Sequence, residues 1–201
     1  MKRTLILFIG ASIISLGASA QKIKLVSGKL GFIKAEKSIA VTYDYSAMGV
    51  GKFKNEQDYI DKKTADYNKK EPGKGDQWAQ AWKNDRASRF QPKFEELLNA
   101  YTKGLGPVFG LGASGTPVVM HVKTTFTEPG YNIAISRAPA MINLEITLKQ
   151  NGSDAAKITL MGSPGNTFGG YDFDTGVRIS EAYAKAGKEL GKFLIKAAKK
   201  G

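Results

Sequence analysis

The 201-residue sequence contains no cysteine. This absence excludes disulfide bonds, zinc–thiolate sites and thiol catalysis, and also the lipid-modified cysteine that follows the signal peptide of a bacterial lipoprotein. We therefore expect the hydrophobic core alone to hold the fold together. The 181 residues after position 20 are enough to bury about 70% of the unfolded surface in a single domain.

Histidine occurs once, as His121, in a stretch without a second histidine or a carboxylate close by in sequence. The alternation of residues 117–127 places Val118, Met120 and Val122 on one face of a predicted strand and His121 on the other. We interpret His121 as a residue of the sheet surface. The sequence indicates no catalytic residue, no metal site and no cofactor.

Acidic residues are few, at 18 against 30 lysines and arginines, for a net charge of +12. A charge of this size attracts anions, such as lipopolysaccharide phosphates, acidic glycans or nucleic acid. Nucleic acid is not expected as a partner, because the chain carries no nucleic-acid-binding motif. The lysines are spread along the whole sequence, which favours a solubilising surface over a single basic patch.

Long apolar runs are absent after the first twenty residues. Lys2 and Arg3 precede the apolar run Leu5–Ile14, and Ala18-Ser-Ala20 has the pattern that signal peptidase cleaves. The run is too short to cross roughly 30 Å of hydrocarbon. We predict a signal peptide over 1–20, no transmembrane span, and a periplasmic protein, with secretion as the second choice. Cleavage would leave 28 basic residues, 18 acidic residues and a net charge of +10.

Apolar periodicity predicts one α/β domain over residues 21–201. Alternation indicates strands at 38–45, 117–127 and 140–150, the last forming a hairpin with 155–161. Residues 23–26 and 30–33 are expected to form a short hairpin or an edge segment. Helical spacing follows Asn55 and Asp76, which we expect to be N-caps. Pro92 should kink the second helix or divide it near Ser88. The prediction is a two-layer α/β sandwich: a mixed sheet of four or five strands with helices on one face.

The final helix is predicted to be amphipathic. One stripe is apolar, and the opposite stripe holds Lys185, Lys188, Lys192, Lys196 and Lys199. Such a helix either lies on an anionic membrane surface or packs on its own sheet. We expect packing, because the one-sided sheet needs a cover. Gly187 and Gly191, four residues apart, should let the helix approach that sheet closely.

An acidic turn, Tyr171–Gly176, precedes this helix and carries the most suggestive chemistry. Asp174-Thr-Gly176 matches the aspartic-protease motif, but no second copy is present. Asp172-x-Asp174 resembles a calcium loop, but positions 6 and 12 hold Val177 and Tyr183 in place of glycine and glutamate. The favoured interpretation is a helix cap by Asp174 or Thr175.

The candidate binding residues are Tyr131, Asp172 and Asp174. The predicted function is a non-enzymatic envelope protein that binds a protein partner or an anionic envelope polymer. The alternative is a hydrolase of an envelope glycan or peptide, which would need a carboxylate pair drawn from Asp172, Asp174 and Glu128.

The order of elements, with Phe173-Asp-Thr-Gly176 before the last helix, resembles uncharacterised exported proteins of Gram-negative bacteria. More loosely, residues 38–200 are similar to anticodon-binding-like envelope domains, namely the periplasmic domain of the curli secretion channel subunit and the amino-terminal domain of TolB. The resemblance implies an α/β envelope domain and no catalytic residues. The chain differs from the lipoproteins of this group because it lacks the cysteine that carries the lipid.

Overall fold

The computed structural model describes residues 21–110, 115–133, 135–165 and 174–199. The predicted signal peptide and Asp172 lie outside these ranges. A mixed seven-stranded sheet runs in the order β1-β9-β8-β5-β2-β4, and β3 also pairs with β5. Its strands are β1 (Lys22–Gly28), β2 (Ser38–Asp44), β3 (Gly49–Val50), β4 (Val108–Gly110), β5 (Val118–Glu128), β8 (Met141–Gln150) and β9 (Ser153–Pro164).

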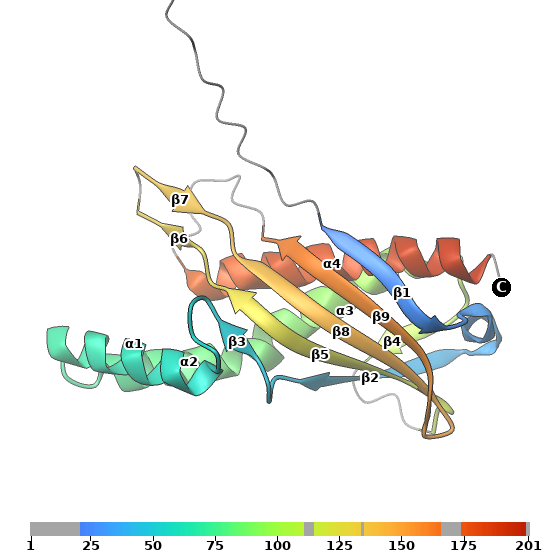
Figure 1. The fold of residues 1–201 in the computed structure, drawn as a ribbon, viewed down its shortest axis with the longest axis horizontal. Helices are drawn as coiled ribbons and strands as arrows, with labels where there is room; N and C mark the ends of the chain where they lie inside the picture. The colour runs from blue at the N-terminus through green and yellow to red at the C-terminus, as the bar shows by residue number, and fades with distance from the viewer. Residues whose placement is uncertain (1–20, 111–114, 134, 166–173, 200–201) are drawn as a thin grey trace, which may run out of the picture.

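The helices lie on one side of this sheet (Figure 1). They are α1 (Glu56–Lys70), α2 (Lys74–Asp85), α3 (Gln91–Thr102) and α4 (Thr175–Ala198), with a five-residue π-helix, η2 (Arg86–Phe90), between α2 and α3. The predicted two-layer α/β architecture is confirmed. The sheet is larger than the four or five strands expected, because short strands such as β3 and β4 carry too little alternation to be recognised in sequence.

The core lies between the sheet and α3–α4. Alternate residues of the long strands point into it, as the period of two requires: Val118, Met120, Val122, Leu144, Ile146, Leu148, Ile158 and Leu160 are all buried. The α4 residues Ile179, Ala182, Tyr183, Ala186, Leu190 and Leu194 close the core from the helical side. The β8–β9 hairpin is confirmed, with Asn151 and Gly152 at positive φ in its turn.

The N-terminal strand lies at the edge of the sheet, which agrees with one of the two predicted alternatives. β1 runs antiparallel to β9, with Ile23 opposite Leu160, and does not form a hairpin with residues 30–33. Those residues enter η1 (Gly31–Ala35), a 3-10 helix in which Ile33 is fully buried. A short apolar run identifies an extended or buried segment but says nothing of its partner, which here lies over 130 positions away in sequence.

The two helix glycines of α4 face another helix and not the sheet. A Cβ on Gly187 would stand 2.2 Å from the Phe94 carbonyl oxygen, and one on Gly191 would stand 2.9 Å from the Tyr101 Cβ. Both neighbours belong to α3 or its end. The expected close approach therefore occurs, but it joins α4 to α3.

The α1–α2 hairpin projects from one end of the molecule as an arm (Figure 1). Asn55 caps α1 as predicted, accepting from the Asp58 N–H. Asp76 does not cap α2, because Gly73 in the left-handed conformation starts that helix earlier. η2 then separates α2 from α3 two residues before Pro92, which agrees with the predicted division. A second small hairpin, β6 (Tyr131–Asn132) with β7 (Arg137–Ala138), extends beyond the sheet.

Candidate functional site

The predicted site residues have mainly local roles. Asp174 caps α4, since its Oδ1 accepts from the Gly176 N–H at 2.7 Å, and its Oδ2 pairs with Arg89 Nη1 at 2.7 Å. Burial acts to raise the pKa of Asp174, but Arg89 and the amide of Gly176 outweigh it and hold the pKa below the ordinary value. Tyr131 is exposed on β6, with its hydroxyl 3.2 Å from Ser136 Oγ. Asp172 lies outside the described residues.

Arg178 brings the surroundings of Tyr131 and Asp174 together. Its Nε donates to the Pro129 carbonyl at 3.3 Å, and its Nη2 donates to Thr175 Oγ1 at 3.0 Å. The turn before Tyr131 therefore lies beside the first turn of α4, although 45 positions separate them in sequence. The guanidinium is buried, so this contact fixes the junction between the turn and α4.

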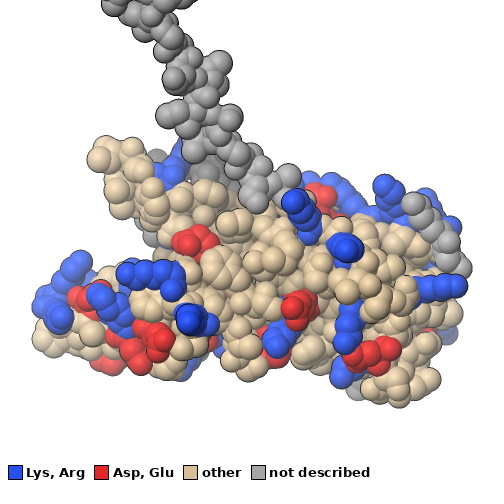
Figure 2. Space-filling view, viewed as in Figure 1, with Lys and Arg blue, Asp and Glu red and all other residues tan. Residues whose placement is uncertain are grey.

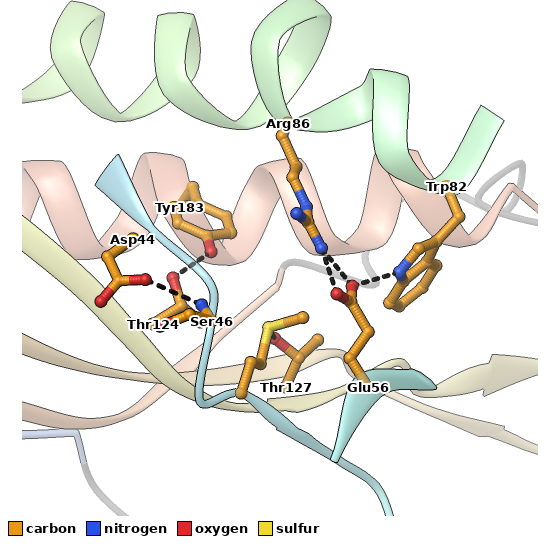
Figure 3. A network of polar contacts seen from close by, with 9 residues as sticks. Asp44, Ser46, Glu56, Trp82, Arg86, Thr124, Thr127 and Tyr183 are labelled. Carbon is orange, nitrogen blue, oxygen red and sulfur yellow. Dashed lines mark hydrogen bonds and ion pairs between the residues drawn. The ribbon is translucent and has the colours of Figure 1, made fainter. Parts of the chain in front are cut away.

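A partly buried polar network joins the arm to the body (Figure 3). Glu56 at the start of α1 pairs with Arg86 of η2 and also accepts from Trp82 Nε1 at 2.6 Å. The Arg86 guanidinium lies 4.3 Å from the centre of the Tyr45 ring. Behind it, the hydroxyls of Tyr183 and Thr124 are 2.6 Å apart in the core, where burial raises the pKa of Tyr183.

This network surrounds a space of about 10 Å³, which is room for roughly one water molecule. Single-turn π-helices often mark functional positions, but here the π-helix serves packing. It places Arg86 against Tyr45 and Glu56 while Phe90 stacks on Tyr183 with ring centres 5.2 Å apart. We assign the network a structural role: it sets the position of the arm.

Among the described residues, a concave surface with a consistent chemistry lies between α4 and the outer strands of the sheet. We call it the α4 groove; its volume is about 510 Å³ and its lining comprises Gln21, Ile23, Pro164, Lys185, Glu189, Lys192, Phe193 and Lys196. Ile23 and Phe193 pack partly against the core and give the groove an apolar floor. Three lysines of α4 border it, and Figure 2 shows basic side chains gathered over this part of the molecule.

The charge of the α4 groove is positive on balance. Glu189 Oε1 lies 3.4 Å from Lys185 Nζ and 2.9 Å from Lys192 Nζ. Burial acts to raise the pKa of Glu189, but the two ammonium groups outweigh it and hold the carboxylate ionised. Three lysines therefore face one carboxylate. The side-chain amide of Gln21 adds a buried nitrogen and oxygen without hydrogen-bond partners among the described residues.

The sequence predicted the lysine stripe of α4 but not the groove that it borders. The lysine stripe of the last helix was recognisable from its spacing, and the structure shows that Lys185, Lys192 and Lys196 line the groove. The opposite wall was missed, because Gln21 and Ile23 reach α4 only through the long-range pairing of β1 with β9. No local sequence signal reports that pairing.

The described part of the chain offers no metal centre. Within it, no group of three histidine, aspartate or glutamate side chains is placed to hold an ion. His121 lies on the open sheet face as predicted, with Nδ1 3.0 Å from Thr42 Oγ1 and Nε2 3.9 Å from Asp44 Oδ2. Among the described residues, no helix has the length and apolar character needed to cross a membrane.

Comparisons with known proteins give matches among solved structures. No protein-family model and no curated protein matches the sequence. The fold is similar to the PelC dodecamer from Paraburkholderia phytofirmans in space group P6, with a TM-score of 0.38 and 12% identity over 86% of this chain and 98% of that chain. A variant of that dodecamer in space group C2 gives a TM-score of 0.35 and 11% identity over 83% and 96%.

Proposed function

We propose that this protein is an exported, non-enzymatic binding protein of the cell envelope, and that the α4 groove holds an anionic polymer. The observation that carries the proposal is the composition of the groove: an apolar floor with Lys185, Lys192 and Lys196 on its border and Glu189 as its one acidic residue. Its length along α4 suits an extended chain, since these lysines span three turns at about 5.4 Å per turn.

The chemistry of the groove favours a polymer that is both charged and partly apolar. Ammonium groups at the border attract repeated negative charges from a distance. Ile23 and Phe193 supply contact area once the polymer lies in place. A signal peptide over 1–20, predicted from the sequence, would deliver the chain to the compartment where acidic glycans and lipopolysaccharide occur.

The hydrolase alternative receives less support from the positions of its carboxylates. Asp174 is occupied as a helix cap and by Arg89. Glu128 accepts from the Gly130 N–H at 3.2 Å in a separate turn. A glycosidase or aspartic protease needs two carboxylates that face one substrate bond, whereas these two stabilise local backbone structure.

The test measures binding of polygalacturonate, a polyanionic saccharide, with uncharged dextran as the comparison. We expect binding that weakens with salt and a loss of about tenfold or more in the triple variant Lys185→Gln, Lys192→Gln, Lys196→Gln. The control, Lys69→Gln with Lys70→Gln and Lys83→Gln, removes the same charge from exposed positions on the arm helices.

An equal loss in both triple variants would mean that net charge alone drives binding, and the α4 groove would not be the site. Phe193→Ala separates the two contributions further. It leaves every charge in place, so a fall in affinity with an unchanged salt dependence supports a role for the apolar floor. The proposal would also be contradicted if the protein retained an envelope protein but no polymer.

A further inference from the structure

A second concave site lies at the base of the arm, and it shares no residue with the α4 groove. We call it the arm niche. Its volume is about 190 Å³, and it is lined by Val50, Gly51, Lys52, Phe53, Tyr59, Lys63, Glu128, Pro129 and Gly130. We propose that the arm niche binds a sugar unit that carries a carboxylate, that is, a uronic acid.

The first element of the niche is a rigid aromatic wall. The rings of Phe53 and Tyr59 meet edge to face with centres 5.7 Å apart. The ring centre of Tyr59 lies 5.7 Å from that of Trp78 and 5.1 Å from that of Trp82. Trp82 is itself fixed by its hydrogen bond to Glu56. An aromatic face is electronegative and attracts the weakly positive C–H groups on one face of a pyranose ring. A wall fixed before binding loses little side-chain entropy when a sugar stacks on it.

The second element is a pair of ammonium groups. Lys52 Nζ lies 5.6 Å from the centre of the Phe53 ring, and Lys63 Nζ lies 5.9 Å from that of Tyr59. Among the described residues, neither lysine has a carboxylate as an ion-pair partner; each is held over a ring instead. Cation–π contacts at exposed sites are weak, at about 0.5–1 kcal/mol. A carboxylate on a ligand can therefore draw both ammoniums to itself at small cost.

The third element is a single hydrogen-bond acceptor opposite the lysines. Glu128 Oε1 accepts from the Gly130 N–H, and a Cβ built on Gly51 would stand 3.7 Å from Glu128 Oε2. Gly51 has a φ of +55° and no side chain, so the second carboxylate oxygen stays accessible beside it. Figure 2 shows a hollow between the arm and the hairpin side of the molecule, with basic side chains on the side of the arm.

These three elements together select the class of ligand. A uronic acid offers one carboxylate for Lys52 and Lys63, hydroxyl donors for Glu128, and a C–H face for Phe53. Inorganic phosphate lacks the C–H face, and its second negative charge would be repelled by Glu128. A neutral hexose lacks the partner for the two ammoniums. The volume of the niche, about 190 Å³, admits one sugar unit.

The test is saturation-transfer NMR on the whole protein with glucuronate and glucose as separate probes. Inorganic phosphate, which has no carbon-bound protons to observe, is added as a competitor of glucuronate. The two tryptophans behind Tyr59 provide a second signal, because their fluorescence should change when glucuronate stacks on the wall. We expect glucuronate to bind through its ring protons and glucose to bind about tenfold more weakly, since it lacks the charge-assisted contacts.

Two variants and one control locate the effect. Lys52→Gln with Lys63→Gln should bring glucuronate down to the affinity of glucose, and Phe53→Leu should weaken both sugars while it keeps the apolar volume. The triple lysine variant of the α4 groove is the control and should bind glucuronate normally. Its polymer binding can fail without affecting this result, so the two proposals are tested separately.

The proposal is overturned if phosphate binds as well as glucuronate and Phe53→Leu has no effect, which would indicate a simple anion site. It is also overturned if glucuronate binds equally well to the double lysine variant. Circular dichroism of each variant confirms that the fold is kept, as is expected because Lys52 is exposed and Lys63 is only partly buried.

Discussion

The ion pair between Glu56 and Arg86 should be worth more than any surface pair of this protein. Their side chains are 16% and 23% exposed, and Glu56 is also the acceptor for Trp82 Nε1. Glu56→Ala leaves a guanidinium mostly out of water without its partner and an indole N–H without an acceptor. Breaking a fully buried pair costs about 3–5 kcal/mol, and partial exposure lowers this toward about 2–3 kcal/mol.

A double-mutant cycle measures the interaction itself. We expect Glu56→Ala to lower the free energy of unfolding by about 3 kcal/mol and the double variant with Arg86→Met to lower it by clearly less than the sum of the singles. The melting temperature of Glu56→Ala should fall by about 6–12 °C for a chain of this length. The exposed pair Lys62–Asp66 is the control, with an expected coupling of at most about 0.5 kcal/mol.

The assay follows urea unfolding by two signals. Circular dichroism reports the whole fold, while tryptophan fluorescence reports the arm, because Trp78 and Trp82 both belong to α2. In Glu56→Ala the fluorescence transition should precede the dichroism transition. If the losses of unfolding free energy in the two single variants add up to the loss in the double variant within about 0.5 kcal/mol, the two side chains do not interact. In that case the role assigned to the network in holding the arm is refuted.

Two further predictions concern α4. Gly187→Ala places a methyl group 2.2 Å from the Phe94 carbonyl oxygen, so it should lower the free energy of unfolding by about 1–3 kcal/mol; Gly104→Ala, with no atom within 4 Å, should change it little. Asp174→Ala should cost about 1 kcal/mol at neutral pH. Because Arg89 and the helix amide lower the pKa of Asp174 from 3.8, this contribution is complete above that pH and is lost as the pH falls through the lower folded-state pKa. A wild-type advantage in urea unfolding that stays constant in acid would contradict this assignment.

The elements whose information is local could be predicted from the sequence. The β8–β9 hairpin follows from alternation and the turn at Asn151-Gly152. The cap at Asp174 and the apolar stripe of α4 follow from helix chemistry. Each of these depends on side chains within a few turns of one another, which a sequence pattern records directly.

The elements that depend on distant contacts could not be predicted. Gly75 lies inside α2 because that helix packs on α1; a Cβ there would stand 2.1 Å from the Thr64 carbonyl oxygen. The parallel pairing of β2 with β5 and the pairing of β1 with β9 are likewise set by long-range packing. Both candidate binding sites lie at such junctions, which explains why the sequence pattern indicated the lysine stripe of α4 but neither the α4 groove nor the arm niche.

The partly buried network and the arm niche are connected through the tryptophans. A buried ion pair is weak evidence of stability, since apolar side chains of similar volume often do as well. The pair of Glu56 and Arg86 also orients neighbouring side chains. Glu56 fixes the indole of Trp82, and Trp82 in turn fixes the ring of Tyr59. That ring is the arm's part of the niche wall. We infer that the ion pair serves the geometry of the niche more than the stability of the fold, so its loss should loosen the arm before it unfolds the sheet.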